Sequence, residues 1–456
     1  MKIGMMGAGR VGCASALVLA ELGHDVTLFD VDPARVVQLE AGEVPFFEAG
    51  IEAALRAART SGRWTVTGRA EALTACDALM IAVPTPAGTD APYDLACLRA
   101  AADTVREVAA RAGSDLRWRG IFLRSTVLPG TTARVFGTVL AGATTADGDG
   151  VPIGYLPEFF REGSMLADAR RPDRIVVGAD DPALHALARA IFADLDTTWL
   201  ETGIASAELI KTTSNAFLST CISFANEIAR LAETIDGVDA VEVLAGLHLD
   251  RRFQGTGRAG IVEFLRPGPG FGGSCLPKDL AALAAFTDAR DGASILDAAL
   301  RINETQPAWL VERIERELGG LGGRRVLVLG LAFKPGTDDL RDSIALPVCG
   351  ALAGRGARTH AHDPQVEPTA AHAQFGPSGV TIVPTEAWSQ AFDDAEAVVL
   401  VTPWPSYLEA LPSMLAARAT PLLFVDTRGI LRGVERAANV TYLGIGARPA
   451  RSGGGV

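Results

Sequence analysis

Apolar and polar positions alternate in blocks through the first part of the chain. The chain opens with the apolar run KIGMM (2–6), a glycine turn, an apolar helical stretch and a second apolar run that ends at Asp30. The apolar runs at 76–86 and 120–131 likewise end in hydroxyl and turn residues. Such runs are typical of buried parallel strands that alternate with helices. We predict a Rossmann-like α/β domain over residues 1–203.

The block pattern stops near residue 200, where residues 206–235 keep a helical period over an unusually long stretch. Charged faces are usually solvated, but a helix that is apolar nearly all round is normally buried. We therefore expect Lys211 and Asn215 to face a ligand, and a buried Lys211 to have a charged or strongly polar partner. The central region, residues 204–317, is predicted to pair two copies of the chain as a homodimer. One narrow polar face of the helix is formed by Glu208, Lys211, Asn215 and Asn226.

Block alternation resumes after the glycine-rich stretch ELGGLGG (317–323), which is predicted to be a flexible linker. Residues 324–446 predict a second Rossmann-like domain, without the phosphate-binding glycine pattern. The predicted fold class is α/β, with two doubly wound Rossmann-like domains joined by a long central helix. His360 and His362 share one strand face, but no cysteine or third histidine accompanies them, so we expect no metal. The tail at 447–456 is expected to be disordered.

The composition limits the partners that the chain can have. Its 456 residues are 48% hydrophobic and carry a net charge of −12, with a sequence pI of about 5.1. An acidic chain is a poor partner for nucleic acid or for an anionic membrane. No stretch resembles a transmembrane span or a secretory signal, and the six cysteines lack CxxC spacing, which favours a reducing compartment. We therefore expect a cytoplasmic protein that binds small molecules.

A dinucleotide-binding pattern follows the first apolar run. Gly7, Gly9 and Gly12 form GxGxxG at the start of the first helix. The first glycine permits a tight turn, the second lets the backbone approach a pyrophosphate, and the third allows close packing of helix and strand. Asp30 is placed to accept hydrogen bonds from a ribose and to repel a 2′-phosphate. The sequence therefore predicts NAD rather than NADP.

Hydroxyl side chains fall at the carboxyl ends of the next two predicted strands, the edge where open α/β sheets bind ligands. Thr85 and Thr126 are expected to contact cofactor or substrate. Ser125 fits a ligand contact or a turn cap equally well.

Charged side chains mark two further loops. The segment IGYLPEFFREGSM begins as a strand and turns polar at Glu158, Arg161 and Glu162. The first loop of the second domain carries Lys334 and Arg341, which fit a diphosphate contact or a solvated pair equally well.

One cysteine stands outside any aliphatic pattern. Cys275 lies in the glycine-rich stretch GFGGSCLPKDL, where small neighbours leave a thiol reachable. The nearby Lys278 would favour the thiolate, the form that attacks a carbonyl carbon. Cys275 is therefore predicted to be a nucleophile. The others lie in apolar helix or strand patterns and are expected to be buried: Cys13, Cys76, Cys97, Cys221 and Cys349.

Taken together, these motifs resemble the UDP-glucose/GDP-mannose dehydrogenase family. The resemblance covers essentially the whole chain in order, from the opening glycines through VPTP, RSTVLPGT, PEFFREG, the long helix and GFGGSCLPKD to GLAFKPGTDDLRDS. It implies NAD-dependent oxidation of a nucleotide sugar's primary alcohol to a carboxylate by two hydride transfers, through a cysteine-bound thiohemiacetal and thioester. UDP-glucose or dTDP-glucose is the implied type of substrate, and GDP-mannose is the alternative.

The resemblance also implies residue roles. Cys275 would be the covalent tether, while Lys211 and Asn215 would stabilise negative charge on oxygen, by about 3 kcal/mol each. Asp279 and Thr126 would position the hydrolytic water, with Glu158 as a helper, and the glycines beside the thiol would admit the sugar. Cofactor contacts are implied at Gly7, Gly9, Val11, Gly12, Asp30, Arg35, Thr85, Thr126, Glu162, Lys278 and Arg341. Substrate contacts are implied at Phe159, Phe160, Arg161, Lys211, Asn215, Arg252, Phe264, Gly272 and Lys334.

The chain departs from the family pattern at several positions. Leu156 stands where the family usually has asparagine before PEF, so one polar contact must be made differently or not at all. The segment DRRFQGTGR offers both Arg252 and Arg258 for the arginine that often reaches across a dimer to the substrate. GGSC in place of GGHC argues against the N-acetylmannosamine branch, whereas the base (uracil, thymine or guanine) stays open.

Two other classes of protein would share part of this pattern. A one-step NAD dehydrogenase has the opening domain, the long helix and a buried lysine, but no use for Cys275. A non-catalytic protein that senses nucleotide sugars would keep the pockets without needing the complete set of Cys275, Lys211 and Asn215.

Overall fold

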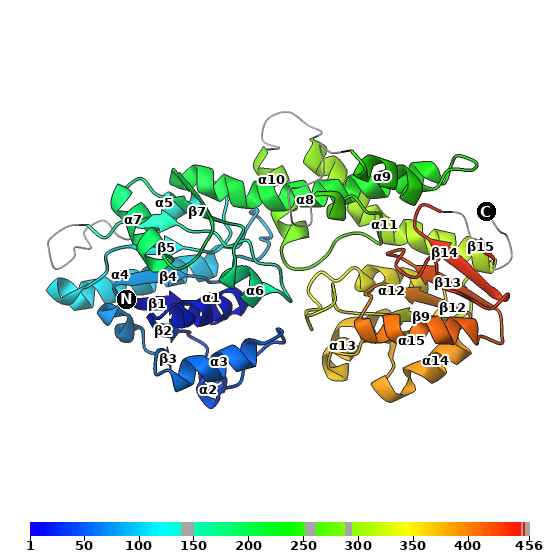
Figure 1. Ribbon diagram of the computed structural model, residues 1–456, viewed down its shortest axis with the longest axis horizontal. Coiled ribbons are helices and arrows are strands. Elements are labelled where there is room, and N and C mark those ends of the chain that lie inside the picture. The colour runs from blue at the N-terminus through cyan, green and yellow to red at the C-terminus, as the bar shows by residue number, and fades with distance from the viewer. Residues whose placement is uncertain (138–149, 251–260, 288–293, 448–449, 452–456) are drawn as a thin grey trace. The chain divides into compact units, whose positions relative to one another are not determined.

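The computed structural model describes residues 1–137, 150–250, 261–287, 294–447 and 450–451. The chain forms two compact units, Met1–Ser214 and Asn215–Val456. Each unit contains one mainly parallel sheet accompanied by helices, and Figure 1 shows the elements of each. The predicted α/β class with two doubly wound sheets is confirmed.

The sheet of the first unit has the strand order β3-β2-β1-β4-β5-β6-β7-β8. Neighbouring strands are parallel except β6 and β7. The order reverses between β1 and β4, which is the switch point where such sheets bind ligands. The strands are β1 (Lys2–Met6), β2 (Asp25–Phe29), β3 (Trp64–Thr67), β4 (Ala78–Ile81), β5 (Ile121–Leu123), β6 (Ile153–Tyr155), β7 (Arg174–Gly178) and β8 (Thr198–Thr202).

Two apolar cores cover the two faces of this sheet, because successive side chains of a strand point to opposite sides. In β4, Leu79 packs into one core and Met80 into the other. The Met80 core includes side chains of α1 (Arg10–Glu21), α2 (Pro33–Ala41), α3 (Ile51–Thr60), α6 (Met165–Arg170) and α7 (Pro182–Ile191). The Leu79 core includes those of η1 (Ala70–Ala75), α4 (Ala96–Ala112) and α5 (Thr131–Phe136).

Helix α8 (Ile204–Ala232) confirms the predicted long helix, and the boundary between the two units falls inside it. Its polar face is buried: Glu208 and Asn226 have no exposed surface, and Lys211 is 4% exposed. The expectation that this face is not a solvated one is therefore confirmed. Several large apolar side chains of α8 are exposed instead, on another side of the helix.

The second unit continues with helices and then its own sheet. Its sheet has the order β11-β10-β9-β12-β13-β14-β15, parallel throughout except for β14 and β15. The strands are β9 (Arg325–Leu329), β10 (Arg358–His362), β11 (Thr381–Ile382), β12 (Ala397–Leu400), β13 (Leu422–Asp426), β14 (Val440–Gly444) and β15 (Ala450–Arg451). The helices include α9 (Ala240–His248), η3 (Ile261–Phe264), α10 (Leu276–Thr287), α11 (Ile295–Leu318), α12 (Ala345–Gly354), α13 (Pro368–Phe375), α14 (Trp388–Asp394) and α15 (Pro405–Ala416).

Three local predictions are wrong. The stretch 317–323 is not a flexible linker, because its first two residues close α11, Gly319 ends that helix with φ 67°, and Leu321 is buried in the core. The tail is not disordered throughout, because β15 pairs with β14, while residues 448–449 and 452–456 lie outside the described part. Cys97 is exposed rather than buried, because it lies in the first turn of α4 on the outer side.

Within the described residues, no helix combines the length and apolar character that crossing a bilayer requires.

Candidate active site

The glycine turn after β1 has the geometry that a pyrophosphate requires. Gly7 adopts φ 99°, and a Cβ on Gly12 would lie 1.8 Å from the Gly7 carbonyl oxygen. A Cβ on Gly9, in contrast, would meet no other atom within 4 Å. Two of the glycines are therefore needed for the turn and for helix packing, and the third leaves open space in front of α1. The turn fits NAD.

Asp30 lies directly after β2, beside this turn, and is buried. Its Oδ2 accepts a hydrogen bond from Ala8 N–H (2.6 Å) and lies 3.2 Å from Arg35 Nη1. Its Oδ1 accepts one from Asp32 N–H (2.9 Å). A carboxylate can accept about four hydrogen bonds, so Asp30 keeps capacity for a ribose hydroxyl.

The hydroxyls at the strand ends bind backbone. Thr85 Oγ1 donates to the Thr126 carbonyl (2.7 Å), and Ser125 Oγ donates to the Val83 carbonyl (2.7 Å). These bonds join the loops that follow β4 and β5. The Ser125 hydroxyl thus links two loops rather than capping its own turn, and the ligand contacts of Thr85 and Thr126 stay predictions. Val11, in the first turn of α1, is partly exposed.

Lys211 has the charged partner that its burial requires. Its Nζ donates to the Glu158 carbonyl (2.6 Å) and lies 3.2 Å from Glu158 Oε1. The other carboxylate oxygen of Glu158 accepts from Phe160 N–H (2.6 Å), and the Phe159 ring centroid lies 5.4 Å from Nζ. One ammonium and one carboxylate are thereby fixed beside the loop that follows β6, with little solvent to screen them.

Glu208 lies on the same polar face of α8 and has a structural role. Its carboxylate accepts from Gly130 N–H (2.6 Å), Thr132 N–H (2.8 Å) and Thr132 Oγ1 (2.6 Å). Burial raises the pKa of Glu208, and these hydrogen bonds oppose that rise. Glu208 therefore holds the first turn of α5 and the loop that contains Thr126.

The polar residues that follow Glu158 are paired as well. Arg161 binds Asp168 through Nε (3.1 Å), Nη2 (2.6 Å) and its backbone N–H (2.7 Å). Glu162 Oε1 lies 3.0 Å from Arg10 Nε, next to the glycine turn. Leu156, where the family usually has asparagine, is a buried core residue.

Cys275 lies at the start of α10 in the second unit, with an exposed side chain. Its carbonyl accepts the hydrogen bond of Asp279 N–H (2.9 Å), and its Sγ lies 3.7 Å from Ser274 Oγ. The N-terminus of a helix carries partial positive charge, which stabilises a thiolate. The thiol is therefore reachable, and its role as a nucleophile stays a prediction.

Asp279 links Cys275's helix to α8. It is buried, its Oδ2 accepts from Asn215 Nδ2 (2.6 Å), and its Oδ1 lies 2.5 Å from Lys278 Nζ. Of the predicted catalytic residues, the structure thus brings Asn215 and Asp279 together one helical turn from Cys275. Lys278, expected to favour the thiolate and to contact NAD, contacts the Asp279 carboxylate.

A side chain at either of two glycines before Cys275 would collide with neighbouring protein, and access of a sugar beside the thiol stays a prediction. A Cβ on Gly272 would lie 2.1 Å from the Asp342 carbonyl oxygen, and a Cβ on Gly273 would lie 2.7 Å from the Phe333 ring. Close packing of the loop against residues 333–344 explains their presence. A substrate contact by the Gly272 backbone stays a prediction.

The remaining predicted binding residues are spread over loops of the second unit. Arg341 pairs with Asp339, with Nε 2.9 Å from both carboxylate oxygens, and Lys334 Nζ lies 5.6 Å from the Phe333 ring centroid. Phe264 ends η3 and is partly exposed. Arg252 and Arg258 lie outside the described residues.

Two arginines at strand ends were missed by sequence reasoning. Arg124, just after β5, is 6% exposed, and its Nε has no hydrogen-bond partner among the described residues. Arg428, just after β13, is half-buried beside Gly268, and the described residues place no carboxylate in ion-pair contact with it. Burial lowers the pKa of each to about 10, opposed by Glu158 and Asp426, respectively. The sequence feature that could have pointed to both residues is an arginine within two positions of the end of a buried parallel strand.

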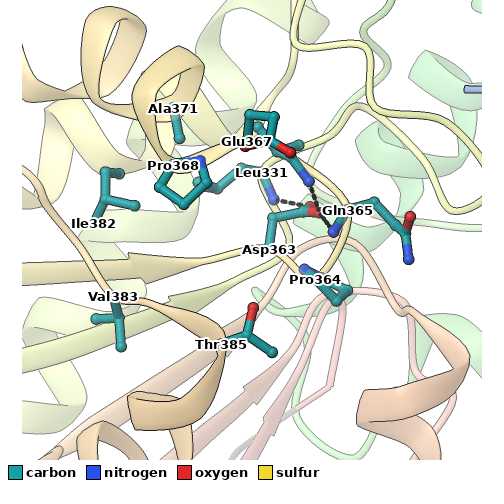
Figure 2. Close-up of a pocket in the computed structure, with 11 residues that line it drawn as sticks. Leu331, Asp363, Pro364, Gln365, Glu367, Pro368, Ala371, Ile382, Val383 and Thr385 are labelled. Carbon is teal, nitrogen blue, oxygen red and sulfur yellow. Dashed lines mark hydrogen bonds between the residues drawn. The ribbon is translucent and has the colours of Figure 1, made fainter. Parts of the chain in front are cut away.

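The second unit also has a hollow of about 150 Å³ beside the carboxyl end of β10, shown in Figure 2. Asp363 lies in its wall. Asp363 Oδ1 accepts from Gln365 N–H (2.9 Å) and Val366 N–H (3.2 Å), and its Oδ2 accepts from the N–H of Leu331 (2.8 Å) and Ala332 (3.0 Å). This carboxylate is therefore occupied by the protein's own backbone, and none of the predicted site residues lines the hollow.

Comparisons with known proteins agree with this arrangement. Three descriptions of the UDP-glucose/GDP-mannose dehydrogenase family match in order: the NAD binding domain (residues 1–196), the central domain (205–305) and the UDP binding domain (327–433). UDP-glucose 6-dehydrogenase AglM of Haloferax volcanii is 36% identical, over 89% of this chain and 92% of its own. UDP-glucose 6-dehydrogenase of Pseudomonas aeruginosa is 36% identical over 98% and 97%. A UDP-glucose dehydrogenase structure from Pyrobaculum islandicum is 38% identical over 98% of both chains, with a TM-score of 0.86.

Proposed function

The chain belongs to the UDP-glucose/GDP-mannose dehydrogenase family, and on that premise we propose that it oxidises the primary alcohol of UDP-glucose to the uronic acid. The observation that carries the proposal is the exposed thiol of Cys275, at the start of a helix that also carries the buried Asp279. A one-step dehydrogenase needs no nucleophile, whereas oxidation of an alcohol to a carboxylate through a thioester does.

NAD, when bound, accepts one hydride in each of the two oxidations. In the first, the sugar's CH₂OH loses a hydride and its hydroxyl proton and becomes an aldehyde. Cys275 then adds to the aldehyde carbon, so that a C–S bond forms and the carbonyl oxygen becomes the hydroxyl of a thiohemiacetal. Loss of a second hydride and of that proton gives a thioester, and water breaks the C–S bond to release carboxylate and thiol. Overall, one alcohol, one water and two NAD give one carboxylate, two NADH and three protons.

Two hydrogen-bond donors of α8, one charged and one neutral, serve the oxygen of the reacting carbon. Lys211 and Asn215 donate hydrogen bonds to this oxygen where negative charge develops, a role that is worth about 3 kcal/mol per preorganised donor. Glu158 holds Lys211 in place, and Asp279 holds Asn215. Asp279 and Thr126 position the attacking water, as the family pattern implies.

Binding roles follow the family pattern and the charges at the strand ends. We assign Arg35, Thr85, Glu162, Lys278 and Arg341 to NAD, and the backbone from Phe159 to Arg161, Arg252, Phe264, Gly272 and Lys334 to the sugar nucleotide. To these we add Arg428. A half-buried guanidinium that forms no ion pair with a carboxylate among the described residues is suited to the substrate's diphosphate. Its neighbour Gly268 lies in the same loop as Cys275.

The test is a stoichiometry. NADH formed per sugar nucleotide is measured by absorbance with UDP-glucose, dTDP-glucose and GDP-mannose, each at limiting concentration. We expect two NADH per UDP-glucose and formation of the uronic acid. One NADH per sugar, or a product that stops at the aldehyde, would contradict the proposal. A clear preference for GDP-mannose would keep the reaction and change the substrate.

We also propose that the enzyme is a homodimer that works in the cytoplasm, where its thiols stay reduced. Exposed apolar side chains recur along α8 every seven or eight residues: Leu209, Phe217, Phe224 and Leu231, each more than two-fifths exposed. A contiguous apolar stripe of this kind needs a partner, and a second copy of the same helix presents a matching one. Light scattering at micromolar concentration should give twice the chain mass, and a fully active monomer would contradict the dimer.

A further inference from the structure

Arg10 is the first residue of helix α1 and stands between the second and third glycines of the GxGxxG turn. Gly9, immediately before it, caps the helix in an extended conformation and borders open space. The first backbone hydrogen bond of α1 runs from Cys13 N–H to the Gly9 carbonyl (2.9 Å). The Arg10 side chain therefore starts from the place where the helix receives a pyrophosphate.

The Arg10 guanidinium contacts two loops. Its Nε lies 3.0 Å from Glu162 Oε1, its Nη1 donates to the Phe47 carbonyl (3.3 Å), and its Cζ lies 5.0 Å from the centroid of the Phe46 ring. The side chain is 19% exposed, so it is not fully covered by the protein. A guanidinium has five N–H donors in a planar fork, which matches the geometry of phosphate oxygens.

The negative charge of Glu162 would repel an anionic ligand at this point, so binding such a ligand requires a cation between them. The Glu162 carboxylate is 11% exposed and lies beside the N-terminus of α1. A pyrophosphate bound at the same helix end would bring two more negative charges into a poorly screened environment. We propose that Arg10 binds the pyrophosphate of NAD and separates it from Glu162. The proposal depends on the NAD-binding part of the proposed function and not on the sugar or on Cys275.

The same side chain has a structural role that a test must separate. The segment from residue 43 to residue 50 is fixed to α1 by Arg10. It is also fixed to the turn before α6, because Glu48, 4% exposed, accepts hydrogen bonds from Gly163 N–H (2.8 Å) and Met165 N–H (2.7 Å). Loss of Arg10 would loosen this segment as well as remove a phosphate ligand.

The primary experiment compares ligands with and without the pyrophosphate. Dissociation constants are measured by calorimetry for NAD and ADP-ribose, and by displacement of NADH fluorescence for adenosine, with wild type and Arg10→Met. We expect the dissociation constants of NAD and ADP-ribose to rise about ten- to hundredfold, as for loss of charge-assisted hydrogen bonds. That of adenosine should change less than about twofold. The NAD constant should also depend less steeply on NaCl concentration.

Two control variants identify the cause. Glu48→Gln weakens the hold on the 43–50 segment without touching the pyrophosphate, so its NAD affinity should stay within about threefold of wild type. Arg10→Met combined with Glu162→Gln removes both charges. Because Glu162 is itself assigned to NAD, the double variant is compared with Glu162→Gln alone. If the two bind NAD equally tightly, Arg10 only neutralises Glu162 and the proposal is wrong. It is also wrong if Arg10→Met weakens adenosine and ADP-ribose by the same factor. Absence of NAD binding by wild type would instead contradict the proposed function.

Discussion

The two sheets of the molecule begin in the same way, with a strand, a glycine and an acid. Gly7 N–H bonds the Phe29 carbonyl at the end of β2, and Gly330 N–H bonds the His362 carbonyl at the end of β10, both at 2.8 Å. Both glycines have positive φ, 99° and 93°. Asp30 follows β2 and Asp363 follows β10, each accepting backbone N–H groups from the glycine turn. The backbone framework of a dinucleotide site is thus present twice.

The side chains around the two acids differ. Asp30 accepts from two backbone N–H groups and faces Arg35, whereas Asp363 accepts from four backbone N–H groups and from Trp404 Nε1 (3.0 Å). Ala332, fully buried, takes the place that Gly9 has in the first turn. The first site therefore keeps room and hydrogen-bonding capacity for a ligand, and the second has used both for its own stability. Equal backbone geometry does not imply equal function, because the acceptor capacity of one carboxylate decides what can bind.

The largest effect is expected for Cys275, which tests whether the second unit takes part in the reaction or only binds the substrate. Cys275→Ser preserves volume but replaces the thiol, which attacks as a thiolate in the proposed mechanism, by a hydroxyl that is scarcely ionised at neutral pH. Turnover to the uronic acid should fall by at least about a thousandfold, while NAD still binds. Steady-state NADH formation measures the loss. Intact-mass analysis of wild type during turnover should show a hydroxylamine-sensitive acyl adduct at Cys275, and near wild-type turnover of the variant would overturn the thioester mechanism.

The second prediction compares the two acids directly. Asp363→Ala leaves five donors without an acceptor, four of them buried, so the free energy of unfolding should fall by about 3 to 5 kcal/mol. Asp30→Ala should cost less stability, because Arg35 and Asp32 are partly exposed to water, and should instead weaken NAD binding. Denaturant titration and calorimetry measure both quantities for both variants. The comparison fails if Asp363→Ala unfolds no more easily than Asp30→Ala.

The third prediction concerns pH and the aromatic cluster next to Asp363. Burial lowers the pKa of His362 from 6.5 to about 4, opposed by Asp363. The ring is 1% exposed, bonds Tyr407 Oη (2.7 Å) and stacks on Trp388. The unfolded chain therefore binds an extra proton between about pH 4 and 6.5. The neutral, buried His362 ring therefore contributes fully to the free energy of unfolding above pH 6.5. This contribution is lost as the pH falls to about 4, a change of about 3 kcal/mol.

The test is a set of urea titrations of wild type and His362→Gln between pH 4 and 7.5. The difference in unfolding free energy between them should shrink as the pH falls. His360→Gln, on the same strand and partly exposed, is the matched control and should leave the pH dependence of wild type unchanged. A difference that stays constant with pH would mean that His362 titrates normally.

The smallest expected effect sharpens the role of Asp30. A 2′-phosphate would meet the Asp30 carboxylate at hydrogen-bond distance, so wild type should prefer NAD to NADP by about a hundredfold in kcat/KM. In Asp30→Ala the repulsion is gone and Arg35, now without its 3.2 Å partner, is available to the phosphate. The preference should fall to less than about tenfold. Equal use of both cofactors by wild type would refute the selection.

The sequence by itself determined the features that depend on residues close together in the chain. Strand and helix periodicity gave the two sheets and the long α8, and the spacing of Gly7, Gly9, Gly12 and Asp30 gave the cofactor turn. A glycine with positive φ or an acid at a strand end acts within one turn of the backbone. Such features are therefore visible before any distant contact is known.

Only the tertiary structure decided which distant loops meet. Lys211 finds Glu158, 53 residues away, and Asp279 finds Asn215, 64 residues away. Composition alone likewise does not reveal that the Asp342 carbonyl occupies the space beside Gly272. Sequence alone also does not reveal that Trp404 Nε1 donates a hydrogen bond to the Asp363 carboxylate and uses part of its remaining acceptor capacity. Local pattern places an acid at the end of a strand, but the number of donors around it depends on side chains that the fold brings from elsewhere.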